Sequence, residues 1–158
     1  MTSKVGAVTS GLSSRVSGDR EAASAARAVT ASPQPEAARP CTILLVDDDA
    51  LICMATSSML QDLGHEVVEA SSGRDALAIL RAGTRVDVVL TDQAMPGMTG
   101  TQLASAIRAA WPDLPVMLTT GYAELPENAV LKLPRLDKPF GQDELAAAIA
   151  NLVRAGAP

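Results

Sequence analysis

The sequence contains very few aromatic residues, cysteines and histidines: one Phe, one Trp, one Tyr, two Cys and one His among 158 residues. The cysteines at positions 41 and 53 match no common metal-ligand spacing, and an apolar chain of this length needs no disulfide framework. We therefore expect Cys41 and Cys53 to be reduced thiols. With so few aromatic side chains, the core must be built from Leu, Ile, Val, Met and Ala.

Long apolar runs and a surplus of basic residues are missing as well. No run approaches the roughly 18 consecutive apolar residues of a membrane span, and the formal charge of -5 disfavours a general nucleic-acid binder. Residues 1–40 are rich in Ala, Ser and Pro, and they lack both a periodic apolar stripe and the apolar segment of a secretory signal. We expect residues 1–40 to be a disordered extension, residues 41–156 to form one domain, and the protein to be cytoplasmic.

From position 41 onward, short β-rich runs alternate with helical patterns. The predicted strands cover residues 42–46, about 66–69, 86–91 and 115–119, with a short fifth piece at 135–137. Strand and helix in strict alternation favour a doubly wound parallel sheet with crossover helices on both faces.

The helical segments show apolar residues at spacings of three and four. The predicted inward faces are Ile52, Ala55, Met59 and Leu63; Ala76, Leu77 and Leu80; Leu103, Ala106, Ile107 and Ala110; and Leu145, Ala148, Ile149 and Leu152. Prolines within 121–137 leave room for a turn or two of helix at most, so we expect a shortened fourth helix region.

Polar side chains stand at the ends of several predicted strands. The first strand runs into Asp47 and Asp48, and the third ends at Asp92. If these strands are neighbours, three carboxylates meet and repel one another by several kcal/mol at an effective dielectric of about 20. A hard divalent cation relieves this repulsion, and oxygen-only ligands suit Mg²⁺ better than zinc. Thr120 and Lys138 add a hydroxyl and a positive charge, which suit an arriving phosphoryl group.

This combination resembles the receiver domain of two-component response regulators. The resemblance covers about residues 41–156 and rests on the acidic pair, the Asp-x-x-Met-Pro-Gly-Met loop at 92–98, the Thr-Gly step at 120–121 and Lys-Pro-Phe at 138–140. It implies a flavodoxin-like fold with five parallel strands in the order 2-1-3-4-5.

The resemblance also implies a role for each matching residue. It implies that Asp92 is the phosphoacceptor. Asp47, Asp48 and Asp92 would bind Mg²⁺, together with the backbone carbonyl of Ala94. Thr120 and Lys138 would bind the phosphoryl oxygens.

The function implied is that of a phosphorylatable signalling module. A sensor histidine kinase or phosphotransfer protein would supply the phosphoryl group from a phosphohistidine, and the receiver would bind an unknown downstream protein or pass the phosphoryl group along a relay. Only six residues follow Leu152, so we expect a stand-alone receiver without nucleic-acid or membrane partners. We expect no enzyme activity beyond its own phosphorylation and dephosphorylation.

Some residues depart from the family pattern. Arg135 stands three places before the lysine, where the family often has an aromatic switch residue, and Tyr122 is our candidate to act instead. Thr99 replaces a frequent Asp but can still cap a helix. Ala94 cannot position an attacking water, so we hypothesise that Ala94 and Tyr122 shield the aspartyl phosphate and make it long-lived.

A second class of function fits part of the same pattern. A haloacid-dehalogenase-type phosphohydrolase would use Asp47 and Asp49, with Thr119 or Thr120 and Lys138, but it leaves Asp92 without a role. We expect Asp49 to be only a helix cap. Two remaining predictions concern single residues: Trp111 packs at a helix end, and His65 lies in a surface turn.

Overall fold

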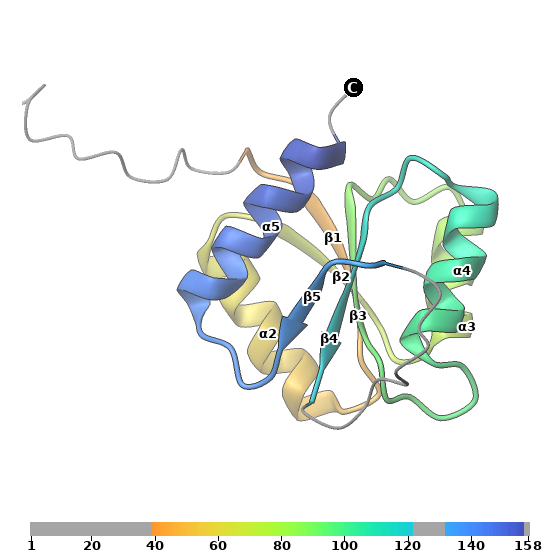
Figure 1. Ribbon diagram of the computed structural model, residues 1–158, viewed down its shortest axis with the longest axis horizontal. Coiled ribbons are helices and arrows are strands. Elements are labelled where there is room, and N and C mark those ends of the chain that lie inside the picture. The colour runs from red at the N-terminus through yellow and green to blue at the C-terminus, as the bar shows by residue number, and fades with distance from the viewer. Residues whose placement is uncertain (1–38, 122–131, 157–158) are drawn as a thin grey trace, which may run out of the picture. The chain divides into compact units, whose positions relative to one another are not determined.

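The computed structural model describes residues 39–121 and 132–156 (Figure 1). In order along the chain, the elements are β1 (Thr42–Val46), α2 (Ala50–Asp62), β2 (Glu66–Ala70), α3 (Gly73–Arg81), β3 (Val88–Asp92), α4 (Gly100–Ala110), β4 (Val116–Thr120), β5 (Arg135–Asp137) and α5 (Gln142–Gly156). Each predicted strand is present, with β3 starting at Val88 and not at position 86. The predictions for residues 1–38, for Tyr122 and for the shortened helix region at 122–131 lie outside the described residues.

The strands form one parallel sheet in the order β2-β1-β3-β4-β5, as predicted. Helices α2 and α5 cover one face, and α3 and α4 cover the other (Figure 1). The register places Val46 of β1 beside Thr91 of β3, and Asp92 beside Thr119 of β4. The carboxyl ends of β1, β3 and β4 therefore meet at one edge of the sheet. Within the described residues, no helix is long and apolar enough to cross a membrane.

The core has two parts, one on each face of the sheet. Leu44, Val89, Leu103 and Ile107 belong to the cluster on the α3–α4 face, and Trp111 packs against it from the end of α4, as predicted. Ile43, Leu90, Leu145 and Ile149 belong to the cluster on the α2–α5 face, which also contains both cysteines. Cys41 and Cys53 form no disulfide, in agreement with the expected reduced thiols, and both are buried.

The predicted inward face of α2 is wrong. Its buried residues are Cys53, Thr56, Ser57 and Leu60, whereas Ile52 is 38% exposed. The first turns of this helix are apolar on every side, so apolar spacing does not select one face. The buried face includes two hydroxyl residues, which a search for apolar residues passes over. The predicted faces of α3, α4 and α5 are largely correct, since Leu80, Leu103 and Leu145 among others are buried.

The prediction that His65 lies in a surface turn is also wrong, because its side chain is 5% exposed. Gly64, with a φ of 90°, turns the chain so that the backbone N–H of His65 donates to the carbonyl of Leu60 at 3.1 Å. The imidazole then lies against Cys41, whose backbone N–H donates to Nδ1 at 3.4 Å. This bond requires an unprotonated Nδ1. Burial lowers the pKa of His65, which favours the same neutral ring.

Candidate functional site

The carboxyl edge of the sheet brings together the three carboxylates named from the sequence. Asp47, Asp48 and Asp92 each place an oxygen within 4.8 Å of the others. Asp47 follows β1, and Asp92 is the last residue of β3, so the parallel pairing of these strands creates the cluster. Asp47 and Asp92 are buried while Asp48 is exposed. A cluster of hard oxygen atoms with one side open to solvent fits a Mg²⁺ ion that keeps several of its waters.

Lys138 lies against two of the three carboxylates. Its Nζ donates to Oδ1 of Asp92 at 3.0 Å and lies 3.6 Å from Oδ2 of Asp47. Burial alone would lower the pKa of Lys138, but its hydrogen bond to Asp92 and the charges of Asp92 and Asp47 outweigh burial and raise it. The side chain of Lys138 is therefore a positively charged ammonium group. The other oxygen of Asp47, Oδ1, accepts from the backbone N–H of Asp49 at 2.9 Å, which fixes this carboxylate from two sides.

Thr120 lies at the end of β4 with its side chain buried. Its hydroxyl donates to Oδ1 of Asp137 at 3.3 Å, and its carbonyl accepts from the backbone N–H of Lys138 at 2.8 Å. The sequence prediction missed Asp137, although the strand-end argument applied to Asp92 could have found it. Asp137 ends β5, so it reaches the same edge of the sheet.

A second residue that the sequence prediction missed is Gln93, next to Asp92. Its side chain is buried, and Oε1 accepts from both the backbone N–H and the hydroxyl of Thr101, at 2.9 and 2.7 Å. Its carbonyl accepts from the backbone N–H of Gly100 at 3.1 Å. Gln93 thus ties the loop after β3, which includes the exposed Ala94, to the first turn of α4. No signal in the sequence distinguishes this buried amide from an exposed one.

The start of α4 approaches the site closely. A Cβ at Gly100 would collide with the main-chain oxygen of Asp92, so glycine allows the helix to begin there. Thr99 caps the helix as predicted, in a reciprocal capping box with Gln102. The helix is therefore fixed against the strand that carries Asp92.

Two other residues lie apart from the cluster. Asp49 is the N-cap of α2, as predicted: its Oδ1 accepts from the backbone N–H groups of Leu51 and Ile52, at 2.9 and 3.3 Å. The carboxylate that a haloacid-dehalogenase-type enzyme would need is therefore engaged in capping. Arg135 lies in β5 with an exposed side chain, so it occupies no buried switch pocket.

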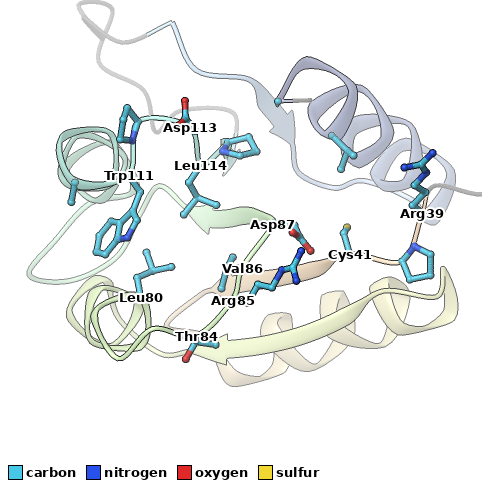
Figure 2. A pocket seen from close by; sticks show the side chains of 16 residues that line it. Arg39, Cys41, Leu80, Thr84, Arg85, Val86, Asp87, Trp111, Asp113 and Leu114 are labelled. Atoms are coloured by element: carbon cyan, nitrogen blue, oxygen red, sulfur yellow. The ribbon is translucent and has the colours of Figure 1, made fainter. Parts of the chain in front are cut away.

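A pocket of about 900 Å³ lies at the opposite, amino-terminal edge of the sheet (Figure 2). Its lining includes Arg39, Cys41, Asp87 and Trp111 and contains none of the predicted site residues. The candidate site is thus not this cavity but the exposed carboxyl edge of the sheet.

Comparison with known proteins decides between the two functional classes. The family model of the response regulator receiver domain matches residues 43–150. This chain belongs to that family. The receiver is 37% identical over 119 residues to the sensor kinase CckA of Brucella abortus, a match that covers 71% of this chain and 12% of that protein. It is 44% identical over 114 residues to the response regulator protein FleR of Pseudomonas aeruginosa, covering 69% of this chain and 24% of that protein.

A solved structure agrees with these matches. The receiver superimposes on the response regulator protein TrrA of Thermotoga maritima in complex with Mg²⁺ and BeF with a TM-score of 0.65. The two are 31% identical, and the match covers 71% of this chain and 98% of that one. The flavodoxin-like receiver fold is confirmed, and the phosphohydrolase alternative has no support. The receiver accounts for only a small part of the curated relatives named above, so their output activities do not carry over.

Proposed function

We propose that this receiver accepts a phosphoryl group on Asp92 from a phosphohistidine of a sensor histidine kinase or phosphotransfer protein. The observation that carries the proposal is the setting of Asp92: a buried carboxylate at the carboxyl edge of the sheet, 3.0 Å from a protonated lysine and grouped with two further carboxylates. Its chemistry would be limited to its own phosphorylation and dephosphorylation, so it would not be an enzyme acting on other substrates.

Asp47, Asp48 and Asp92, with the main-chain carbonyl of Ala94, would hold Mg²⁺. Three carboxylates and one ammonium group leave a net charge of -2, which a divalent cation neutralises. Bound Mg²⁺ supplies positive charge that offsets the charge on phosphoryl oxygens. The cluster offers carboxylate oxygens without Cys or His, which supports Mg²⁺ over zinc.

In the proposed reaction, a carboxylate oxygen of Asp92 attacks the phosphorus as the bond from phosphorus to the donor imidazole breaks. The electron pair of that bond leaves with the imidazole. Lys138 orients the Asp92 carboxylate before the reaction and pairs with a phosphoryl oxygen afterwards, and Thr120 donates its hydroxyl to another. The receiver thus contributes positioning and electrostatics.

Labelling by acetyl phosphate tests this proposal directly. The receiver is expected to be labelled in the presence of Mg²⁺ and to lose labelling in Asp92→Asn. Asp49→Asn is the matched control, because asparagine also caps helices and Asp49 lies outside the carboxylate cluster. Labelling that survives in Asp92→Asn, or disappears in Asp49→Asn, would contradict the assignment.

We further propose that the phosphodonor protein contacts the start of α2. Leu51 and Met54 are 77% and 65% exposed, and Ile52 is 38% exposed, directly after the acidic residues of the site. Exposed apolar side chains grouped in this way are typical of interaction surfaces. Met54→Lys should reduce phosphoryl transfer from a kinase and leave labelling by acetyl phosphate unchanged, because the small molecule needs no docking surface. Equal loss with both donors would refute the contact.

A further inference from the structure

The hydroxyl of Thr120, which donates to a phosphoryl oxygen in the proposed reaction, is hydrogen-bonded to the carboxylate of Asp137 in this structure. Asp137 pairs with Thr120 in the parallel register of β5 on β4. The hydroxyl of Thr120 donates to Oδ1 of Asp137 at 3.3 Å, and the backbone N–H of Lys138 donates to the Thr120 carbonyl at 2.8 Å. Strand pairing therefore keeps the two side chains adjacent, and the hydroxyl has to turn away from Asp137 before it can donate elsewhere.

The number of protons makes the two partners of Thr120 mutually exclusive. A threonine hydroxyl has one proton and donates one hydrogen bond at a time. A carboxylate has none, so the hydroxyl is the donor in the pair with Asp137. While Thr120 donates to Asp137, it cannot donate to an oxygen carried by Asp92. The bond at 3.3 Å is longer than the roughly 2.5–3.0 Å of strong O–H···O bonds, so a better acceptor can replace it.

Thr120 and Asp137 differ in burial, and this difference decides which of them needs the hydrogen bond more. Thr120 is 1% exposed, and within residues 39–121 and 132–156 its hydroxyl donates to Asp137, so losing this acceptor would leave a buried donor without that partner, which is unfavourable. The side chain of Asp137 is exposed and can bind water once it is released. The Thr120 hydroxyl therefore stays bonded to Asp137 until another acceptor arrives. The exposed carboxylate of Asp137 loses little free energy when the bond breaks, because water replaces the hydroxyl.

We propose that Asp137 is a positioning residue that retains the Thr120 hydroxyl in the unphosphorylated receiver and competes with the phosphoryl group for its single proton. This inference rests on the proposed function of Asp92. Asp137 opposes the switched state, and phosphorylation releases its exposed carboxylate from the hydrogen bond with Thr120. Arg135 lies two residues earlier on β5, so the released carboxylate shares its exposed face of the strand with a positively charged side chain.

The test measures binding of beryllium fluoride in the presence of Mg²⁺, as a stable substitute for the phosphoryl group, by NMR titration of the full chain. Asp137→Ala is expected to raise the affinity roughly threefold to fivefold, the size of one modest hydrogen bond. The same substitution should have no effect in a Thr120→Ala background and should keep its effect in Thr120→Ser, which retains a hydroxyl. Asp113→Ala removes an exposed carboxylate near the opposite edge of the sheet and should change nothing.

Each result separates the competing explanations. Asp137→Ala would overturn the inference if it raised the affinity for beryllium fluoride equally in the wild-type and Thr120→Ala backgrounds. An equal gain would reflect only the loss of a negative charge. An unchanged affinity in Asp137→Ala, with normal binding by the wild type, would overturn it too. A wild-type chain that neither binds beryllium fluoride nor is labelled by acetyl phosphate would overturn the proposed function itself, and this inference with it.

Discussion

Gln93 should be one of the most sensitive polar positions for stability, although it touches no reacting group. Gln93→Ala removes an acceptor that serves two donors of Thr101, at 2.9 and 2.7 Å. Each lost hydrogen bond costs about 1 kcal/mol, and leaving the partly buried backbone N–H of Thr101 unpaired adds a similar amount. The free energy of unfolding should therefore fall by about 2–3 kcal/mol. For a domain of this size that corresponds to a decrease in Tm of roughly 8–12 °C.

Urea unfolding followed by circular dichroism measures this change. The midpoint should decrease with an unchanged m-value, because the surface exposed on unfolding stays the same. Gln61→Ala is the matched control: Gln61 is exposed on α2, and its replacement should change the free energy by less than about 0.5 kcal/mol. A second measurement follows from the position of Gln93 between Asp92 and Ala94, since a loosened loop should also weaken Mg²⁺ binding. A loss of stability below about 0.5 kcal/mol in Gln93→Ala would refute the reasoning.

Three further predictions follow from the site and from His65. Lys138→Met should raise Mg²⁺ affinity roughly tenfold by removing a nearby positive charge, while labelling by acetyl phosphate falls; calorimetry that finds the affinity unchanged would contradict this. The pKa of His65 is lowered by burial from its ordinary value of 6.5, so the unfolded chain binds the proton first, and stability should decrease as the pH falls below about 6.5. Urea midpoints between pH 7.5 and 5.5 should show this decrease, and a slope that is unchanged in His65→Phe would rule out His65 as its source. Ala94→Asn should shorten the lifetime of the phosphorylated receiver if Ala94 shields the aspartyl phosphate; a wild-type half-life of seconds that the substitution leaves unchanged would refute the shielding.

The residues that could be predicted from the sequence are those whose position follows from strand ends and from one clear helical stripe. Asp47 and Asp48 follow the mainly apolar strand β1, and Asp92 ends β3, so their meeting required only the parallel order of the sheet. In α4, Leu103 and Ile107 form one unambiguous apolar stripe and are buried as predicted.

The failures have physical reasons of their own. Helix α2 is apolar on every side of its first turns, so its buried face is chosen by packing against the sheet and α5, including Thr56 and Ser57. His65 is buried because Gly64 turns the chain and Cys41, distant in sequence, offers a hydrogen-bond partner. The strand-end argument could have placed Asp137 at the carboxyl edge of the sheet, but its pairing with Thr120 depends on the register of β5 on β4, which sequence periodicity does not specify.

Both cysteines lie in the core cluster on the α2–α5 face, so their chemical reactivity can be used to detect opening of that part of the molecule. Cys41 and Cys53 lie on the face covered by α2 and α5, and burial raises the pKa of each thiol, so neither reacts readily in the folded state. Cys41 also lines the pocket at the amino-terminal edge of the sheet, so Cys53 is the thiol whose rate of modification is set by the opening of that face. Movements confined to α3 and α4 should leave the rate at Cys53 unchanged. A cysteine placed at Ala104, in the opposite cluster, would give the complementary signal. Comparing the two rates with and without a phosphoryl mimic would show which half of the receiver loosens when it switches.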